Sequence, residues 1–283
     1  MKSPVRQFVF NVAVQSIGRA MLARDVAFGW AKIAWEVDPD AAGVSRHRIQ
    51  SGRNHLDAIL VQPIAEPAKA AVLICHGIGE TVQRWHAVQQ LLAANGVASL
   101  VFDYAGYGSS KGFFSAKQSE RDAVAAFHFL AAKVSPLPVS LLGFSLGSGV
   151  AAAIVPRVPA SGLLLCAAFT SIRDAARSLG MPRALLSGVP PIWKAEDALR
   201  ASETPVLIVH GERDRLFPTR MAEQLSACCG ASSRVILVPE LGHSDPYHRP
   251  TAAYWRLIID YLLSRGRADQ PPPARASRKP KKA

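Results

Sequence analysis

The fold is decided by the stretch Leu141-Leu142-Gly143-Phe144-Ser145-Leu146-Gly147-Ser148-Gly149, in which an apolar run ends at the pattern Gly-x-Ser-x-Gly. The run indicates a short buried strand, and the Ala-rich residues after the pattern indicate a helix. A serine in so sharp a strand-to-helix turn has a strained backbone, and the residues two before and two after it are crowded. Gly143 and Gly147 have no side chain and so fit these two positions. The alternative is that the pattern is an ordinary Gly/Ser turn between a strand and a helix.

Buried strands alternate with helices over most of the remaining chain. We expect strands at residues 70–77, 97–102, 138–142, 162–169, 205–211 and 234–238, and helices at 81–95, 116–134, 149–155, 219–228 and 250–264. This alternation predicts a mostly parallel α/β sheet with helices on both faces. Residues 44–49 and 56–61 instead have a period of two around the turn at 51–54, which predicts an antiparallel N-terminal hairpin.

The chain divides into one main domain and two extensions. Residues 44–265 are long enough for a single α/β domain, within which the Pro-containing segment at about 170–202 predicts a short lid. Residues 1–43 form an N-terminal extension, where Ser3-Pro4 begins a predicted helix that is apolar around much of its circumference. We expect that helix to pack on the domain or a second subunit, with contact to a membrane surface as the alternative. Residues 266–283 are predicted to be a disordered basic tail.

The net charge of +12 is concentrated at the C-terminus. Residues 265–283 contain seven basic residues and one acid, Asp269, so this end alone carries +6. Such a terminus is typical of a solvated segment, or of weak attraction to an anionic membrane surface or nucleic acid. We therefore expect no specific nucleic-acid binding, and we keep weak membrane-surface contact through the N-terminal helix or the tail as the alternative to a solvated terminus.

The cysteines indicate a reducing compartment. They have neither metal-ligand spacing nor the pattern of a disulfide framework. They are Cys75, Cys166, Cys228 and Cys229. No run of 18 apolar residues and no signal-peptide pattern is found in the sequence. We expect a cytoplasmic protein, peripheral to the membrane if the extensions bind lipid.

Three polar residues follow separate strands in an order suited to nucleophilic catalysis. A serine hydroxyl needs a base beside it and an acid that holds the base. Ser145, Asp214 and His243 supply these in the order Ser, Asp, His. Glu212 is the near rival of Asp214 for the role of the carboxylate that holds the base, because a shift of one residue in the register of this strand end would exchange them. Asp103 is a more distant rival, and we expect it to fix its own Gly-rich loop.

The negative charge that develops on an attacked carbonyl needs two backbone N–H donors. We expect one from Leu146, directly after the serine, and one from Ile78 in the sequence His76-Gly77-Ile78-Gly79. His76 is predicted to hold that loop, and His210 to pack within a strand. The histidines predicted to be structural or exposed are His47, His55, His86, His128 and His248. We expect neither a metal nor a cofactor.

The chain resembles the α/β-hydrolase superfamily over about residues 44–265, and within it the small-lid serine hydrolases, both acyl-protein thioesterase-like and serine-aminopeptidase-like. The resemblance is carried by His76-Gly77, by residues 103–109, 143–147 and 211–214, and by Gly242-His243. The N-terminal helix and the basic tail are not parts of the common core, and the short lid predicts an open pocket.

The resemblance implies the α/β-hydrolase fold, a small-molecule or acyl substrate, and cleavage of a carboxylic ester or thioester through an acyl-enzyme. Ser145 is the expected nucleophile, His243 the general base and then acid, and Asp214 the orienting carboxylate. A serine peptidase or a carbon–carbon bond hydrolase on the same triad is the alternative. A non-catalytic scaffold that binds through its extensions is a hypothesis of a different class.

Overall fold

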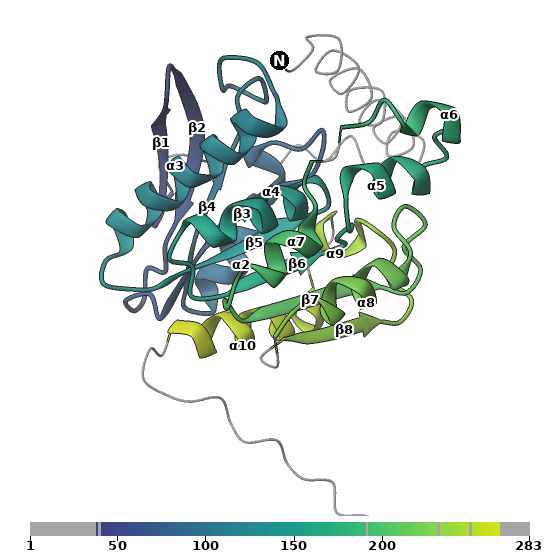
Figure 1. Ribbon diagram of the computed structural model, residues 1–283. Helices are drawn as coiled ribbons and strands as arrows, with labels where there is room; N and C mark the ends of the chain where they lie inside the picture. The colour runs from purple at the N-terminus through teal and green to yellow at the C-terminus, as the bar shows by residue number, and fades with distance from the viewer. Residues whose placement is uncertain (1–37, 39–40, 191, 231–232, 249–250, 267–283) are drawn as a thin grey trace, which may run out of the picture.

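The computed structural model describes residues 38, 41–190, 192–230, 233–248 and 251–266, and this part of the chain forms an eight-stranded sheet (Figure 1). The strand order is β1-β2-β4-β3-β5-β6-β7-β8. The strands are β1 (Val44–Ser51), β2 (Asn54–Val61), β3 (Ala70–Cys75), β4 (Val97–Phe102), β5 (Val139–Phe144), β6 (Leu163–Cys166), β7 (Val206–Gly211) and β8 (Arg234–Val238). The predicted N-terminal helix and basic tail lie outside the described residues.

The sheet is mostly parallel, with an antiparallel hairpin at one edge. β1 and β2 pair from Val44 with Val61 to Ser51 with Asn54, which leaves a two-residue turn whose Gly52 has a φ of +59°. β2 is antiparallel to β4, and every pair from β4 through β8 is parallel. The predicted hairpin and parallel sheet are confirmed. Because the parallel strands share a direction, the loops that follow them meet at one edge.

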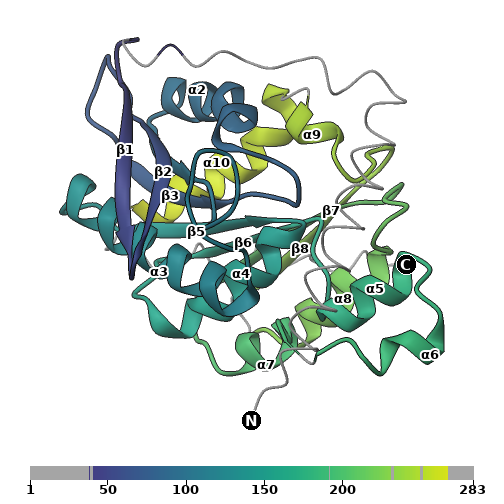
Figure 2. The ribbon, with the colours of Figure 1, turned by 90° about the horizontal axis from the view of Figure 1, so that it is seen from above.

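Helices cover both faces of this sheet, as Figure 2 shows. One face carries η2 (Val82–Trp85), α2 (His86–Ala94), α9 (Asp245–His248) and α10 (Ala252–Gly266). The other carries α3 (Ala116–Val134), α4 (Leu146–Ile154), η3 (Val155–Arg157), α7 (Ala195–Arg200) and α8 (Thr219–Ala227). The predicted helix at 81–95 is split between η2 and α2, and α9 was not predicted because it is only four residues long.

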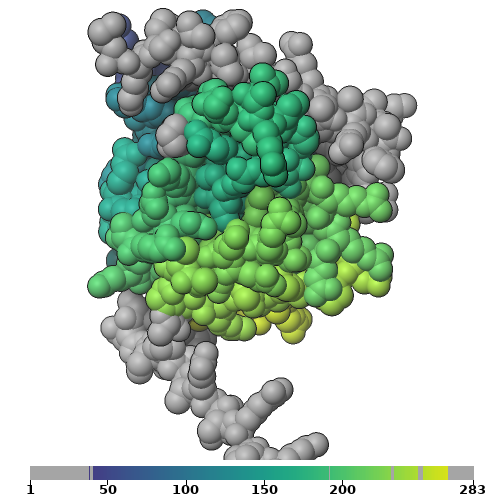
Figure 3. Space-filling view, turned by 45° about the vertical axis from the view of Figure 1, so that its right-hand side comes forward, coloured from purple at the N-terminus to yellow at the C-terminus, as the bar shows by residue number. Residues whose placement is uncertain are grey.

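The segment predicted to be a lid contains α5 (Ile172–Ser178), α6 (Arg183–Leu186) and α7. Figure 1 shows α5 and α6 beyond the carboxyl ends of the strands, and α7 packs against α4 and α8. In the space-filling view this green segment is continuous with the yellow-green surface of the residues that follow it (Figure 3). None of the helices in the described part of the chain is both long and apolar enough to cross a bilayer.

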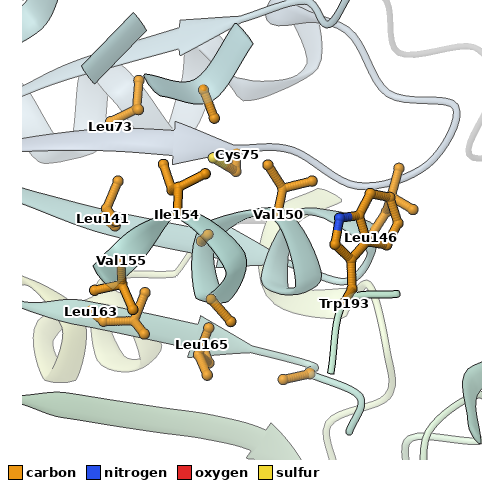
Figure 4. Close-up of a cluster of buried hydrophobic side chains, with 14 of the residues drawn as sticks. Leu73, Cys75, Leu141, Leu146, Val150, Ile154, Val155, Leu163, Leu165 and Trp193 are labelled. Atoms are coloured by element: carbon orange, nitrogen blue, oxygen red, sulfur yellow. The ribbon is translucent and has the colours of Figure 1, made fainter. Parts of the chain in front are cut away.

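Helix α4 is held by apolar packing on the strands beneath it. Val150 and Ile154 lie over Leu73, Leu141 and their neighbours, and both side chains are fully buried (Figure 4). The residues on either side of Leu73 in β3 face the opposite layer, where they pack with α10. Burying a Val or Ile side chain stabilises a fold by about 1.5 to 3 kcal/mol. Because its other side chains are mostly small alanines, α4 can lie close to the sheet, and its first turn is fixed at the carboxyl edge.

The turn before α4 has the strained geometry that the sequence predicts. Ser145 has φ 51° and ψ −116°, a conformation that side-chain-bearing residues rarely adopt. A Cβ on Gly143 would lie 2.4 Å from the carbonyl oxygen of Gly147, and a Cβ on Gly147 would lie 1.9 Å from that of Cys75. Both glycines are therefore required by backbone contacts, and the second contact is with the end of β3.

Two loops at the carboxyl edge rest on a buried polar pair. The Nδ1 atom of His76 is 2.8 Å from the Gly77 carbonyl, and its Nε2 lies 3.6 Å from Oδ1 of Asp103. That carboxyl oxygen also accepts from the Val82 amide at 2.9 Å. A Cβ on Gly108 would lie 1.8 Å from the Asp103 carboxyl. Asp103 thus fixes its own Gly-rich loop, and His76 fixes the preceding one, as the sequence predicts.

We predict that Gly147→Ala lowers the free energy of unfolding by about 2 kcal/mol or more, because a Cβ in this close backbone contact forces α4 away from β3. Gly230→Ala is the matched control, since nothing lies within 4 Å of a Cβ at that position. Urea unfolding measures both variants. A Gly147→Ala protein as stable as the control would contradict the close contact.

Burial raises the pKa of Asp103 to about 7 and lowers that of His76 to about 4. A carboxyl that holds its proton more tightly when folded stabilises the fold below its unfolded pKa near 3.8, and this contribution is lost as the pH rises towards 7. We predict that Asp103→Asn gains stability relative to the wild type between pH 4 and 7, by about 2 kcal/mol.

Chemical denaturation across that pH range measures the difference. Asp260→Asn, at an exposed position in α10, is the control and should show no such trend. A stability difference between Asp103→Asn and the wild type that is constant with pH would contradict the neutral buried carboxyl.

Candidate active site

Three side chains from separate loops converge at the carboxyl edge of the sheet. Ser145 follows β5, Asp214 follows β7 and His243 follows β8. The serine Oγ lies 2.9 Å from Nε2 of His243, and Nδ1 of that imidazole lies 2.7 Å from Oδ2 of Asp214. With Nδ1–H donating to the carboxylate, Nε2 is left to accept the serine proton. The three residues predicted from sequence order are therefore within hydrogen-bond reach of one another.

The turn after β7 aims the Asp214 carboxylate. The Asp214 amide donates to the Gly211 carbonyl, and Oδ1 accepts from the amides of Leu216 and Phe217 at 2.8 and 2.9 Å. Burial opposes ionisation, but the hydrogen bonds from His243 and Phe217 and the nearby imidazoles lower the pKa of Asp214 below its ordinary value. Glu212, its rival in the sequence, has an exposed side chain. The structure thus distinguishes the two carboxylates.

The His243 imidazole is packed between two aromatic rings. Its centroid lies 5.4 Å from that of Phe144 and 5.1 Å from that of Phe217, with which it makes an edge-to-face contact. The Gly242 amide before it donates to the Asp245 carboxylate at 2.8 Å, which fixes the loop. Packing leaves 9% of His243 exposed, so the ring is held in place yet open to the serine. These aromatic supports were not predicted, because ring contacts between distant segments leave no local pattern.

The serine is held by backbone bonds on both sides. Its amide donates to the Cys166 carbonyl at 3.0 Å, and its own carbonyl accepts from the amide and hydroxyl of Ser148 at 2.9 and 2.7 Å. Leu146 is the first residue of the nine-residue helix α4. The partial positive charge of a helix N-terminus is therefore adjacent to the Ser145 hydroxyl, where it favours a developing anion.

The loop after β3 has one amide engaged and the next one free. The Gly77 amide donates to Glu80 Oε2 at 2.7 Å, and the same oxygen accepts from the Trp85 indole at 3.0 Å. Among the described residues, the Ile78 amide donates no backbone hydrogen bond. Ile78 therefore has the available donor in this loop, which agrees with its expected role without testing it. Glu80 was missed, although its position three residues after Gly77 is a recurrent side-chain-to-backbone turn spacing.

Aromatic side chains form a wall between the Gly-rich loop and the lid segment. The Phe114 ring contacts those of Tyr104 and Tyr107 with centroids 5.9 and 5.1 Å apart, and that of Trp193 at 6.5 Å. Trp193 lies beside Leu146 at the start of α4 (Figure 4). This aromatic cluster thus connects the Gly-rich loop to the lid segment at the start of α4.

In the part of the chain that the structure covers, no group of three or more His, Cys, Asp or Glu side chains is arranged to hold a metal ion. The four cysteines are free thiols, two of them buried in strands. The arrangement of the site is that of a buried hydroxyl, an imidazole and a carboxylate beside free amides. Such a site can transfer an acyl group through the serine.

Sequence comparison finds a matching family model and several similar proteins. The family model for serine aminopeptidase S33 matches residues 66–190. An uncharacterized Mycobacterium tuberculosis protein is 31% identical over 182 residues, which cover 62% of this chain and 63% of that one. The lysophosphatidylserine lipase ABHD12 of Danio rerio is 30% identical over 191 residues, which cover 60% and 50%. The chain thus spans less than two thirds of the length of these relatives.

Solved structures show the same fold. An alpha-beta hydrolase from Vibrio vulnificus has a TM-score of 0.69 at 19% identity, and the match covers 94% of this chain and 95% of that one. A monoglyceride lipase from Saccharomyces cerevisiae has a TM-score of 0.64 at 14% identity, covering 83% and 98%. With its sheet order, its strained serine turn and these structural matches, the chain has the α/β-hydrolase fold.

Proposed function

We propose that the protein hydrolyses a carboxylic ester or thioester through an acyl-enzyme on Ser145. The observation that carries the proposal is the continuous hydrogen-bonded path from the serine Oγ through His243 to Asp214. A serine hydroxyl alone is a weak nucleophile at neutral pH, and this arrangement supplies the base and the carboxylate that it needs.

The reaction has two halves in which His243 moves the proton. Its Nε2 removes the Ser145 proton as Oγ attacks the acyl carbon, and the proton then passes to the departing alcohol or thiol. Water attacks the acyl-enzyme in the second half, with His243 again acting first as base and then as acid. Asp214 holds the Nδ1–H tautomer and stabilises the imidazolium, while the amides of Leu146 and Ile78 stabilise the oxyanion.

An acyl ester is the substrate class that the surroundings favour. Tyr107 and Phe114, the partly exposed members of the aromatic cluster, are available for apolar contact with an acyl chain. Two of the similar proteins are named as lipases, of lysophosphatidylserine and of monoglyceride. The family model is described as an aminopeptidase, which keeps peptide cleavage as the second candidate. A carbon–carbon bond hydrolase uses the same triad and stays an alternative.

We further propose a cytoplasmic location, which the four free thiols support. Weak contact of the N-terminal extension or the basic tail with a membrane surface is a further proposal, which is based on the sequence alone. The scaffold hypothesis requires that no substrate is turned over. Any ester turnover that depends on Ser145 would remove it.

Ser145→Ala and His243→Ala should each lower kcat for a p-nitrophenyl ester by at least about 10³-fold, because the first removes the nucleophile and the second removes its base. Asp214→Asn should cost about 10³- to 10⁴-fold, since the neutral amide no longer holds the imidazole tautomer. Glu212→Gln is the matched control on the same turn and should retain wild-type kcat. Steady-state kinetics measures all four, and an Asp214→Asn enzyme as active as the control would overturn the assignment of the carboxylate.

The substrate class is tested by comparing p-nitrophenyl esters of graded acyl length with aminoacyl anilides at equal concentration. We expect kcat/KM for the best ester to exceed that for every anilide by at least about 10²-fold, and to rise with chain length while each added methylene is buried. Anilide cleavage that equals or exceeds ester cleavage would favour the peptidase instead.

A further inference from the structure

A second imidazole lies against the carboxylate of Asp214. His210 is at the end of β7, and only 1% of its surface is exposed. Its Nε2 is 2.9 Å from the Phe217 carbonyl oxygen and 3.4 Å from Oδ2 of Asp214, the oxygen that also accepts from His243. Two imidazole nitrogens therefore approach one carboxylate oxygen, and the mechanism above uses only one of them.

The surroundings of His210 keep it neutral. Its Nε2 must carry a hydrogen, because the Phe217 carbonyl is an acceptor. Its Nδ1 is buried and has no hydrogen-bond partner among the described residues, so a second proton would be left unsatisfied there. Burial lowers the pKa of His210, and the neighbouring His243 acts in the same direction. The other imidazole, in contrast, faces a hydroxyl to which it can give a proton back.

The two imidazoles thus differ in what they can do for one carboxylate. A charged His210 would compete with protonated His243 for the charge of Asp214, whereas a neutral N–H leaves that charge available. Among the described residues, Glu80 in the loop after β3 also interacts electrostatically with His243, but burial raises the pKa of that carboxyl, whereas the pKa of Asp214 is lowered. The charge stabilising the imidazolium is therefore concentrated on Asp214, and its effect depends on the carboxylate's orientation.

Phe217 links His210 to that orientation. Its amide donates to Oδ1 of Asp214, its carbonyl accepts from His210, and its ring makes an edge-to-face contact with His243. Without the His210 N–H, this buried carbonyl would lose its partner, and one side of the turn that aims the carboxylate would be released.

We propose that His210 is a positioning residue for the triad: its neutral Nε2–H anchors the Phe217 carbonyl and faces Asp214, and so keeps the carboxylate aligned with His243. This inference rests on the proposed hydrolase activity. It assigns His210 no contact with substrate.

Two amide substitutions separate this role from mere packing. In His210→Gln the side-chain amide nitrogen can reach the position of Nε2, whereas in His210→Asn it reaches only that of Nδ1. A third variant, His210→Phe, fills the buried space with a ring that has no donor. All three are compared with the wild type as full-length protein, and thermal unfolding by circular dichroism measures the folded fraction.

We expect His210→Gln to retain kcat within about threefold, and His210→Asn and His210→Phe each to lose about 10- to 100-fold with KM changed by less than about twofold, as misplacement of a catalytic group predicts. The low-field proton NMR signal of the hydrogen bond between His243 and Asp214 should persist in the wild type and His210→Gln, and broaden or vanish in His210→Asn and His210→Phe.

Wild-type kcat and an unchanged NMR signal in folded His210→Asn or His210→Phe would overturn the proposal, as would equal losses in His210→Gln and these two variants. The NMR comparison needs no substrate. If the wild type cleaves no ester, the proposed function fails, while the presence or loss of the signal still decides whether His210 positions the carboxylate.

Discussion

The contact between the first turn of α4 and the carboxyl end of β3 is the constraint on which the site depends. The Cα of Gly147 is so close to the Cys75 carbonyl that no side chain fits between them. This approach forces the preceding Ser145 into its positive φ and lifts its hydroxyl above the sheet edge. The apolar packing of α4 on β3, β5 and β6 holds the strain. The same close packing thus stabilises the core and sets the backbone conformation of Ser145.

Buried polar groups then orient the loops around that serine. Asp103 and His76 support one side of the site, and Asp214 and His210 the other, each pair a carboxyl beside an imidazole. The environments of the two carboxyls differ. Burial keeps Asp103 protonated up to a pKa of about 7, whereas hydrogen bonds lower the pKa of Asp214 and leave it charged. The pair of Asp103 and His76 therefore supports the loops of the site. The pair of Asp214 and His210 instead places a charged carboxylate beside His243.

The sequence predicts the sheet, the hairpin and the three convergent polar residues, because each has a local pattern: an apolar run, a period of two, or a glycine-flanked turn after a strand. It does not predict α9 or the division of residues 81–95 into two helices, since short helices have weak periodicity. Glu80 and Phe217 were also missed. Phe217 acts through a contact across the fold, its edge-to-face packing with His243, which leaves no mark on neighbouring residues. Glu80 accepts from the amide of Gly77, three residues before it, and this short spacing is the one local signal that the sequence offered.

His210 illustrates the same limit from another side. Its place within a strand is readable from the sequence, but its distance from Asp214 is not. The central claim is that Ser145 is the nucleophile, and peptide mapping by mass spectrometry after treatment with a fluorophosphonate tests it most directly. We predict one adduct, on the peptide that contains Ser145, which forms in the native protein and not after denaturation. Adduct on a different residue, or none in folded protein, would contradict the account.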